Sequence, residues 1–135
     1  MTQYLLDVNA LVALGFKDHQ LFEQVVSWVE TLRPDSDEFA TCAITELGFI
    51  RVLARVARYG FSVAEAKVAL LRLKSSGNVG FTFFAEDHDV SRLPAWVKMP
   101  QQTTNGHLAQ LAKAHGATLT TLDRRIPGAF LIPKA

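Results

Sequence analysis

The chain alternates between short apolar runs of β type and longer amphipathic segments with helical spacing. Short runs rich in branched and aromatic residues indicate strands, whereas apolar residues recurring every three or four positions indicate helices. The predicted strands are residues 3–7, 39–44, 80–85 and 117–122, with 129–133 as a candidate fifth. The predicted helices are residues 10–16, 18–33, 45–60, 62–77 and 103–116, and residues 86–100 read as irregular.

Helix boundaries are marked by capping residues. Asp18 is a candidate cap for the segment 18–33, and Thr45 and Gly60 stand at the two ends of the segment 45–60. Ser62 and Glu65 have the spacing of a capping box, in which each side chain bonds to the other residue's backbone. These signals separate the helices from the strands without any long linker.

Strands alternating with helices predict an α/β fold whose mostly parallel sheet is covered on both faces. The length of 135 residues corresponds to one domain, residues 1–135, and we find no repeat or low-complexity tract. In such folds ligands bind beyond the carboxyl ends of the strands. Residues at those ends are therefore the first candidates for function.

Composition narrows the class of protein further. The chain is 49% hydrophobic and 20% charged, which is typical of a globular protein, and its net charge of +1 creates no strong field for nucleic acid. Cys42 has no partner for an internal disulfide and reads as a small buried residue in a reducing compartment. The chain shows no signal peptide and no apolar run of membrane-spanning length, so we expect a cytoplasmic protein without membrane contact.

Four polar residues follow strands or open helices at the predicted sheet edge: Asp7, Glu46, Asn105 and Asp123. Clustered carboxylates repel one another unless a cation neutralises them, and hard cations such as Mg²⁺ or Mn²⁺ prefer oxygen ligands. No Cys and His residues have zinc-site spacing. The natural reaction class for such a rim is metal-assisted phosphodiester hydrolysis. The alternative is structural, with Asp7 and Asp123 acting only as caps of helices or turns.

The segments "LLDVNALVAL", "ITELGFIRVL", "EDHDVSRL" and "TNGHLAQLAKAHGATLTTLD" together resemble a PIN domain of the VapC toxin type over essentially the whole chain. The resemblance implies a three-layer α/β/α sandwich with a parallel sheet. It also implies Mg²⁺- or Mn²⁺-dependent endoribonuclease activity on an RNA substrate, and a small VapB-like antitoxin as inhibitor. A homodimer is common in the family and is compatible with the apolar composition.

The same resemblance assigns roles to residues. Asp7 matches the first acid of the PIN site, Glu46 the second and Asp123 the last. Asn9 matches a polar residue two positions after the first acid. Thr121 matches a small hydroxyl residue near the metal.

One position departs from the family pattern. Asn105 stands in "TNGHL" where the family usually has an acid. Its carbonyl oxygen can still bind a metal or a metal-bound water, but it brings no negative charge. The departure therefore leaves an alternative open, in which the chain is a catalytically weak PIN-like module that binds RNA or a protein.

Arginines provide candidate contacts to RNA or to an acidic antitoxin segment. Arg51, Arg55 and Arg58 are spaced to form one stripe on the predicted helix 45–60, and Arg124 directly follows Asp123. The competing interpretation is a solvated helix face for the stripe and a turn contact for Arg124.

Overall fold

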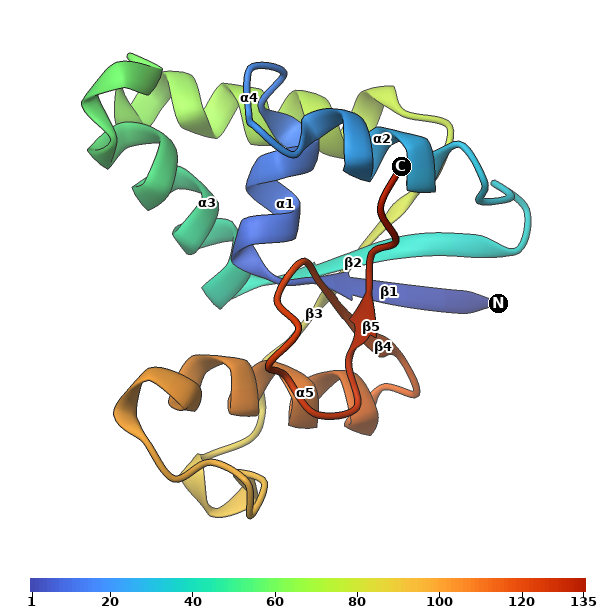
Figure 1. The fold of residues 1–135 in the computed structure, drawn as a ribbon, viewed down its shortest axis with the longest axis vertical. Coiled ribbons are helices and arrows are strands. Elements are labelled where there is room, and N and C mark those ends of the chain that lie inside the picture. Colours follow the sequence, from blue (N-terminus) through green and yellow to red (C-terminus); the bar gives the residue numbers. More distant parts are fainter.

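A computed structural model describes residues 1–135 as one parallel sheet with helices on both faces (Figure 1). The expected α/β fold with a mostly parallel central sheet is confirmed, and each of the pairs between neighbouring strands is parallel. The strand order is β3-β2-β1-β4-β5. The strands are β1 (Thr2–Leu6), β2 (Asp37–Cys42), β3 (Phe81–Phe84), β4 (Thr118–Thr121) and β5 (Phe130–Leu131).

The order of the strands reverses at β1. The chain runs from β1 outward through β2 to β3, and then returns to place β4 on the other side of β1. In open parallel sheets this reversal leaves a crevice beyond the carboxyl ends of the two central strands. Asp7 directly follows β1 and Asp123 lies two residues after β4, so the topology alone places both acids at the crevice.

The helices are divided unequally between the two faces of the sheet (Figure 1). The helices are α1 (Val8–Gly15), α2 (Phe22–Val29), α3 (Ala43–Arg55), α4 (Val63–Ser76) and α5 (Thr103–Ala114). Helices α1 to α4 cover one face around a core that includes Leu11, Phe49 and Leu53. Helix α5 covers the other face, where Leu108 and Leu111 pack against Leu5 of β1. Strands buried on both faces explain the nearly continuous apolar runs in the sequence.

The helix predicted over residues 18–33 is wrong at both ends. Helix α2 spans only Phe22–Val29, and Asp18 lies in an exposed turn rather than at the helix cap. The turn before the helix is closed by His19, whose Nδ1 accepts a hydrogen bond from the Leu21 backbone N–H at 3.0 Å. Residues 18–21 therefore belong to a turn, although the apolar periodicity predicts that they are helical.

The predicted boundaries of the next two elements also shift. The second strand lies at Asp37–Cys42, and α3 begins at Ala43 with Cys42 as its cap. Thr45 does not open the helix but lies in its first turn, where its Oγ1 accepts a hydrogen bond from the Cys42 N–H at 3.0 Å. The helix ends at Arg55, and the separate 3₁₀ turn Ala57–Tyr59 leads to Gly60 with φ of 75°.

Other expectations from the sequence are confirmed. The capping box of Ser62 and Glu65 opens α4, with both hydrogen bonds present at 3.0 and 2.9 Å. Cys42 is a free, fully buried thiol, and burial raises its pKa to about 11. None of the helices has the length and apolar character that crossing a membrane requires.

Candidate active site

Asp7 is held where β1 passes into α1. It caps the helix, and its Oδ1 accepts a hydrogen bond from the Ala10 backbone N–H at 2.8 Å. The residue is only 4% exposed. An acid at a helix start is stabilised by free backbone N–H groups, but a buried carboxylate needs more than one such contact.

The second contact to Asp7 comes from the neighbouring strand. Thr121, the last residue of β4, donates a hydrogen bond from Oγ1 to Asp7 Oδ2 at 2.6 Å. The same Thr121 oxygen accepts a hydrogen bond from the Asp123 backbone N–H at 2.9 Å. One hydroxyl thus joins the ends of two adjacent strands and fixes the position of the backbone of Asp123 relative to the carboxylate of Asp7.

The electrostatics of this pair favour a bound cation. Burial raises the pKa of Asp7, the charge of Asp123 raises it further, and the hydrogen bonds from Thr121 and Ala10 only partly offset these effects. By contrast, hydrogen bonds from Arg125 hold the pKa of Asp123 below its usual range. The Arg125 guanidinium reaches both carboxylate oxygens, each at 3.0 Å. A buried negative charge beside a second, ionised acid is the setting that a hard cation stabilises.

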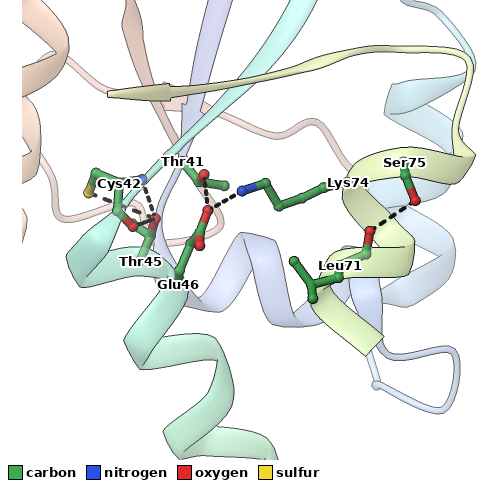
Figure 2. Close-up of polar contacts among 7 residues, drawn as sticks. All are labelled: Thr41, Cys42, Thr45, Glu46, Leu71, Lys74 and Ser75. Atoms are coloured by element: carbon green, nitrogen blue, oxygen red, sulfur yellow. Dashed lines mark hydrogen bonds and ion pairs between the residues drawn. The ribbon is translucent and has the colours of Figure 1, made fainter. Parts of the chain in front are cut away.

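Glu46 reaches the carboxyl end of the sheet from the first turn of α3 (Figure 2). Its Oε2 accepts hydrogen bonds from Thr41 Oγ1 at 2.6 Å and from Lys74 Nζ at 2.5 Å. The Glu46 and Lys74 side chains are 22% and 24% exposed, so the ion pair is largely shielded from water. The acid is thereby fixed by β2 on one side and by α4 on the other.

The three acids occupy one edge of the sheet but have separate partners in the structure. No group of three or more His, Cys, Asp or Glu side chains lies at metal-binding distance. The available donors are nonetheless carboxylate and hydroxyl oxygens around a buried charge, which suits Mg²⁺ or Mn²⁺ in type. Asp7 and Asp123 would hold such an ion if Asp123 shared or left Arg125, which contacts both of its carboxylate oxygens. Binding by Glu46 requires its carboxylate to leave or share Lys74.

The remaining predicted site residues lie around this edge. Asn9 is exposed in the first turn of α1 and lines an open cavity of about 620 Å³ together with Asp123 and Arg124. Asn105 is half-buried at the third position of α5. The cavity provides a route by which a ligand reaches Asp123 from solvent.

The predicted arginine stripe is only partly correct. Arg51 and Arg55 are exposed on α3, but Arg58 lies beyond the end of that helix, in the 3₁₀ turn. There its guanidinium stands 5.4 Å from the centre of the Tyr59 ring. The stripe breaks because α3 ends at Arg55, one turn earlier than the apolar periodicity indicated.

Sequence reasoning missed two residues that contact Glu46. Lys74 lies 28 positions away on another helix, and Thr41 is inside a strand that reads only as apolar. No sequence spacing relates Lys74 to Glu46, because the packing of α3 against α4 brings them together. Thr41 could have been found, since a buried hydroxyl in an apolar strand requires a hydrogen-bond partner.

A further pair of buried polar residues lies on the α5 side of the sheet. His107 Nε2 is 3.5 Å from Glu86 Oε1, and both atoms are buried without a hydrogen bond. Glu86 follows β3, and its proximity adds to the effect of burial in raising the pKa of the Cys42 thiol. Neither residue is among the predicted site residues, although Glu86 lies two residues after the end of β3 and His107 two residues after Asn105.

Comparison with known proteins identifies the family of the chain. Residues 4–129 match the PIN domain family. Ribonuclease VapC38 of Mycobacterium tuberculosis is 34% identical, with 88% of this chain and 84% of the relative covered. Ribonuclease VapC44 of the same species is 32% identical, with 90% of this chain and 87% of the relative covered.

Solved structures share the fold at lower sequence identity. VapBC2 from Rickettsia felis, bound to a promoter DNA fragment, superposes with a TM-score of 0.61 at 16% identity. The match covers 96% of this chain and 97% of the matched chain. VapC20 of Mycobacterium tuberculosis, a toxin that cleaves the sarcin-ricin loop, superposes with a TM-score of 0.61 at 14% identity. The match covers 98% of this chain and 99% of the VapC20 chain. The chain therefore belongs to the PIN-domain family and, within it, to the ribonucleases of the VapC type.

Proposed function

We propose that this protein is an endoribonuclease toxin that hydrolyses RNA phosphodiester bonds with the help of Mg²⁺ or Mn²⁺. The observation that carries the proposal is the Thr121 hydroxyl that joins Asp7 to the backbone of Asp123 at the central crevice of the sheet. This arrangement holds the Asp7 carboxylate next to the backbone of Asp123, at the crevice where parallel sheets with this strand order bind ligands. Relatives named as ribonucleases over most of their length support the same activity.

In this proposal Asp7 and Asp123 hold the cation, with Glu46 as the third acid and Asn105 as a neutral ligand, directly or through water. A cation bound there would activate water and stabilise charge on the phosphoryl oxygens. Asp7 remains in place because α1 and Thr121 fix both of its oxygens. Thr121 and Asn9 act as supporting residues.

The positive residues at the site have a role in binding the substrate. Arg124 is exposed beside Asp123, and Arg51 and Arg55 are exposed on α3. These guanidinium groups provide bidentate donors for phosphate oxygens of RNA or for carboxylates of an antitoxin. A partner of the antitoxin type is supported by the solved VapBC2 complex, whose toxin-like fold this chain shares. A toxin that acts on RNA and is controlled by an antitoxin would work in the cytoplasm. The exposed apolar residues are compatible with a homodimer.

The test is cleavage of a fluorescent single-stranded RNA by the purified protein with Mg²⁺, with Mn²⁺ and with a chelator. We expect cleavage only with metal, and none with Asp7→Asn, which keeps the shape of the side chain. Lys98→Gln, an exposed change outside the site, is the matched control. Metal-independent cleavage, or full activity of the Asp7 variant, would overturn the proposal.

A second candidate function is favoured by one observation. Glu46 and Asp123 are each paired with a basic side chain, and Asn105 brings no charge. A PIN-like module that binds RNA but cleaves poorly would have these properties. RNA binding without cleavage at saturating Mn²⁺ would select this function over the nuclease.

A further inference from the structure

An aromatic ring lies exposed beside the ion pair of Glu46 and Lys74. Phe83 is in β3, an edge strand of the sheet, and the residue is 53% exposed. Phe83 is in register with Thr41 of β2, the residue that bonds to Glu46. Phe83 is therefore the strand neighbour of the residue that hydrogen-bonds to a predicted catalytic acid, and that acid itself lies on α3. A single exposed apolar residue is ordinary, but its position next to a charged site is not explained by packing.

Lys74 connects the ring to the acid. Its Nζ donates a hydrogen bond to Glu46 and stands 5.7 Å from the centre of the Phe83 ring. Figure 2 shows the side chain extending from α4 toward Glu46 and Thr41. An ammonium group has three donors, and the structure uses one of them. Lys74 can therefore hold Glu46 and an anionic oxygen at the same time.

We propose that Lys74 and Phe83 form a nucleotide subsite next to the catalytic acids, in which the ammonium binds an RNA phosphate and the ring stacks with an adjoining base. The proposal rests on the proposed ribonuclease function. Single-stranded RNA is bound by the combination of a positive group that follows the backbone and an aromatic face for the bases. Lys74 and Phe83 supply this combination beside Glu46.

A protein partner is the alternative occupant of this surface, and α4 offers a residue that separates the two. Leu71 precedes Lys74 by one helical turn and is 52% exposed. It adds apolar area to the same region but has no flat face for a base. A docked protein would bury Leu71 together with Phe83, whereas RNA stacking requires the ring alone.

The test is the affinity for a fluorescent single-stranded oligoribonucleotide, measured by anisotropy in the presence of a chelator, because the proposed cleavage requires a divalent metal. We expect Phe83→Leu to weaken binding by about tenfold and Phe83→Trp to retain it, because stacking needs an aromatic face. Lys74→Gln should weaken binding and should reduce the salt dependence of RNA affinity by the amount expected for the loss of about one phosphate contact. Leu71→Ala, and Lys67→Gln at an exposed position of α4, are matched controls that should bind like the unmodified protein.

Thermal denaturation of each variant shows whether it is folded, and we expect Phe83→Leu to preserve the fold because Phe83 is exposed. Equal RNA affinity of Phe83→Leu, Phe83→Trp and the unmodified protein would overturn the proposal. An equal loss with Leu71→Ala would also overturn it, and would identify an apolar docking surface instead. If the unmodified protein neither binds nor cleaves RNA, the proposed function itself fails. If it cleaves RNA while the variants bind normally, only the subsite is wrong.

Discussion

Thr121 donates a hydrogen bond of 2.6 Å to Asp7, a residue 114 positions earlier in the chain. This is the only side-chain donor to the Asp7 carboxylate, whose other oxygen accepts from the backbone of Ala10. Because Thr121 also accepts from the Asp123 N–H, one hydroxyl determines the relative placement of two acids. The small hydroxyl residue expected near the metal thus has a defined structural role.

Thr121→Val should test that role, since valine keeps the shape and removes the hydroxyl. We expect a loss of about 1–3 kcal/mol in the free energy of unfolding, because a buried carboxylate oxygen and a backbone N–H lose their partner. RNA cleavage should also fall. Thr121→Ser is the control, because it keeps the hydroxyl and should retain cleavage even where the missing methyl lowers stability. Urea denaturation measures the stability, and equal curves for the valine variant and the unmodified protein would contradict the prediction.

Asp7→Asn should abolish cleavage, by about 100-fold or more, while leaving the protein folded. A bound divalent cation supplies several kcal/mol of transition-state stabilisation, and Asp7 is its central ligand in the proposed site. Asparagine still caps α1 through its side-chain oxygen. Cleavage rates at saturating Mg²⁺ and far-ultraviolet circular dichroism provide the two measurements.

The same substitution tests how the folding stability of the metal-free protein depends on pH. The pKa of Asp7 is raised by folding from its ordinary 3.8, so the folded state binds more protons than the unfolded state above that value. The stability contribution of Asp7 therefore falls as pH rises from 3.8 through the folded pKa. Asp7→Asn avoids this loss. Its melting temperature should exceed that of the unmodified protein at pH 7, and the difference should shrink toward pH 3.8. A difference that is constant with pH would contradict the expected burial of a charge.

Asn105→Asp addresses the position where the chain departs from its family. A fourth carboxylate at this edge would deepen the negative potential, so we expect the metal concentration for half-maximal cleavage to fall by about tenfold. The metal-free variant should be less stable near neutral pH, because the new charge repels Asp7 and Asp123. Titrations of cleavage and of melting temperature with Mg²⁺ and Mn²⁺ measure both effects. If the variant requires as much metal as the natural protein, Asn105 lies outside the coordination sphere.

The arginines of α3 give a fifth test. If Arg51 and Arg55 bind RNA, the double change to Gln should weaken RNA binding and lower its salt slope by about 0.7 for each lost phosphate contact. If they bind an antitoxin, the complex should weaken while cleavage persists. Arg58→Gln is the control, because Arg58 lies outside α3 and stands beside Tyr59. Unchanged affinity for both partners would assign Arg51 and Arg55 to a solvated surface.

The sequence by itself determined the class of fold and the location of the first candidates for function. Its alternation of apolar runs and amphipathic segments follows from local rules, because strands and helices have different side-chain periods. Asp7 and Asp123 were found because carboxyl ends of parallel strands meet at one edge. The capping box at Ser62 was also predictable, since both of its bonds join residues three positions apart.

Tertiary structure decided every contact between residues that are far apart in the sequence. The strand order places β4 beside β1 and so joins Thr121 to Asp7, although no local pattern specifies which strands become neighbours. The packing of α3 against α4 brings Lys74 to Glu46, and the register of β2 with β3 brings Phe83 beside them. Helix ends shifted because the side chains of His19 and Thr45 accept hydrogen bonds from the backbone N–H groups of Leu21 and Cys42, and these bonds set boundaries that the apolar periodicity does not predict. The candidate acids could be named from the sequence, but which side chains bond to each of them could be established only from the fold.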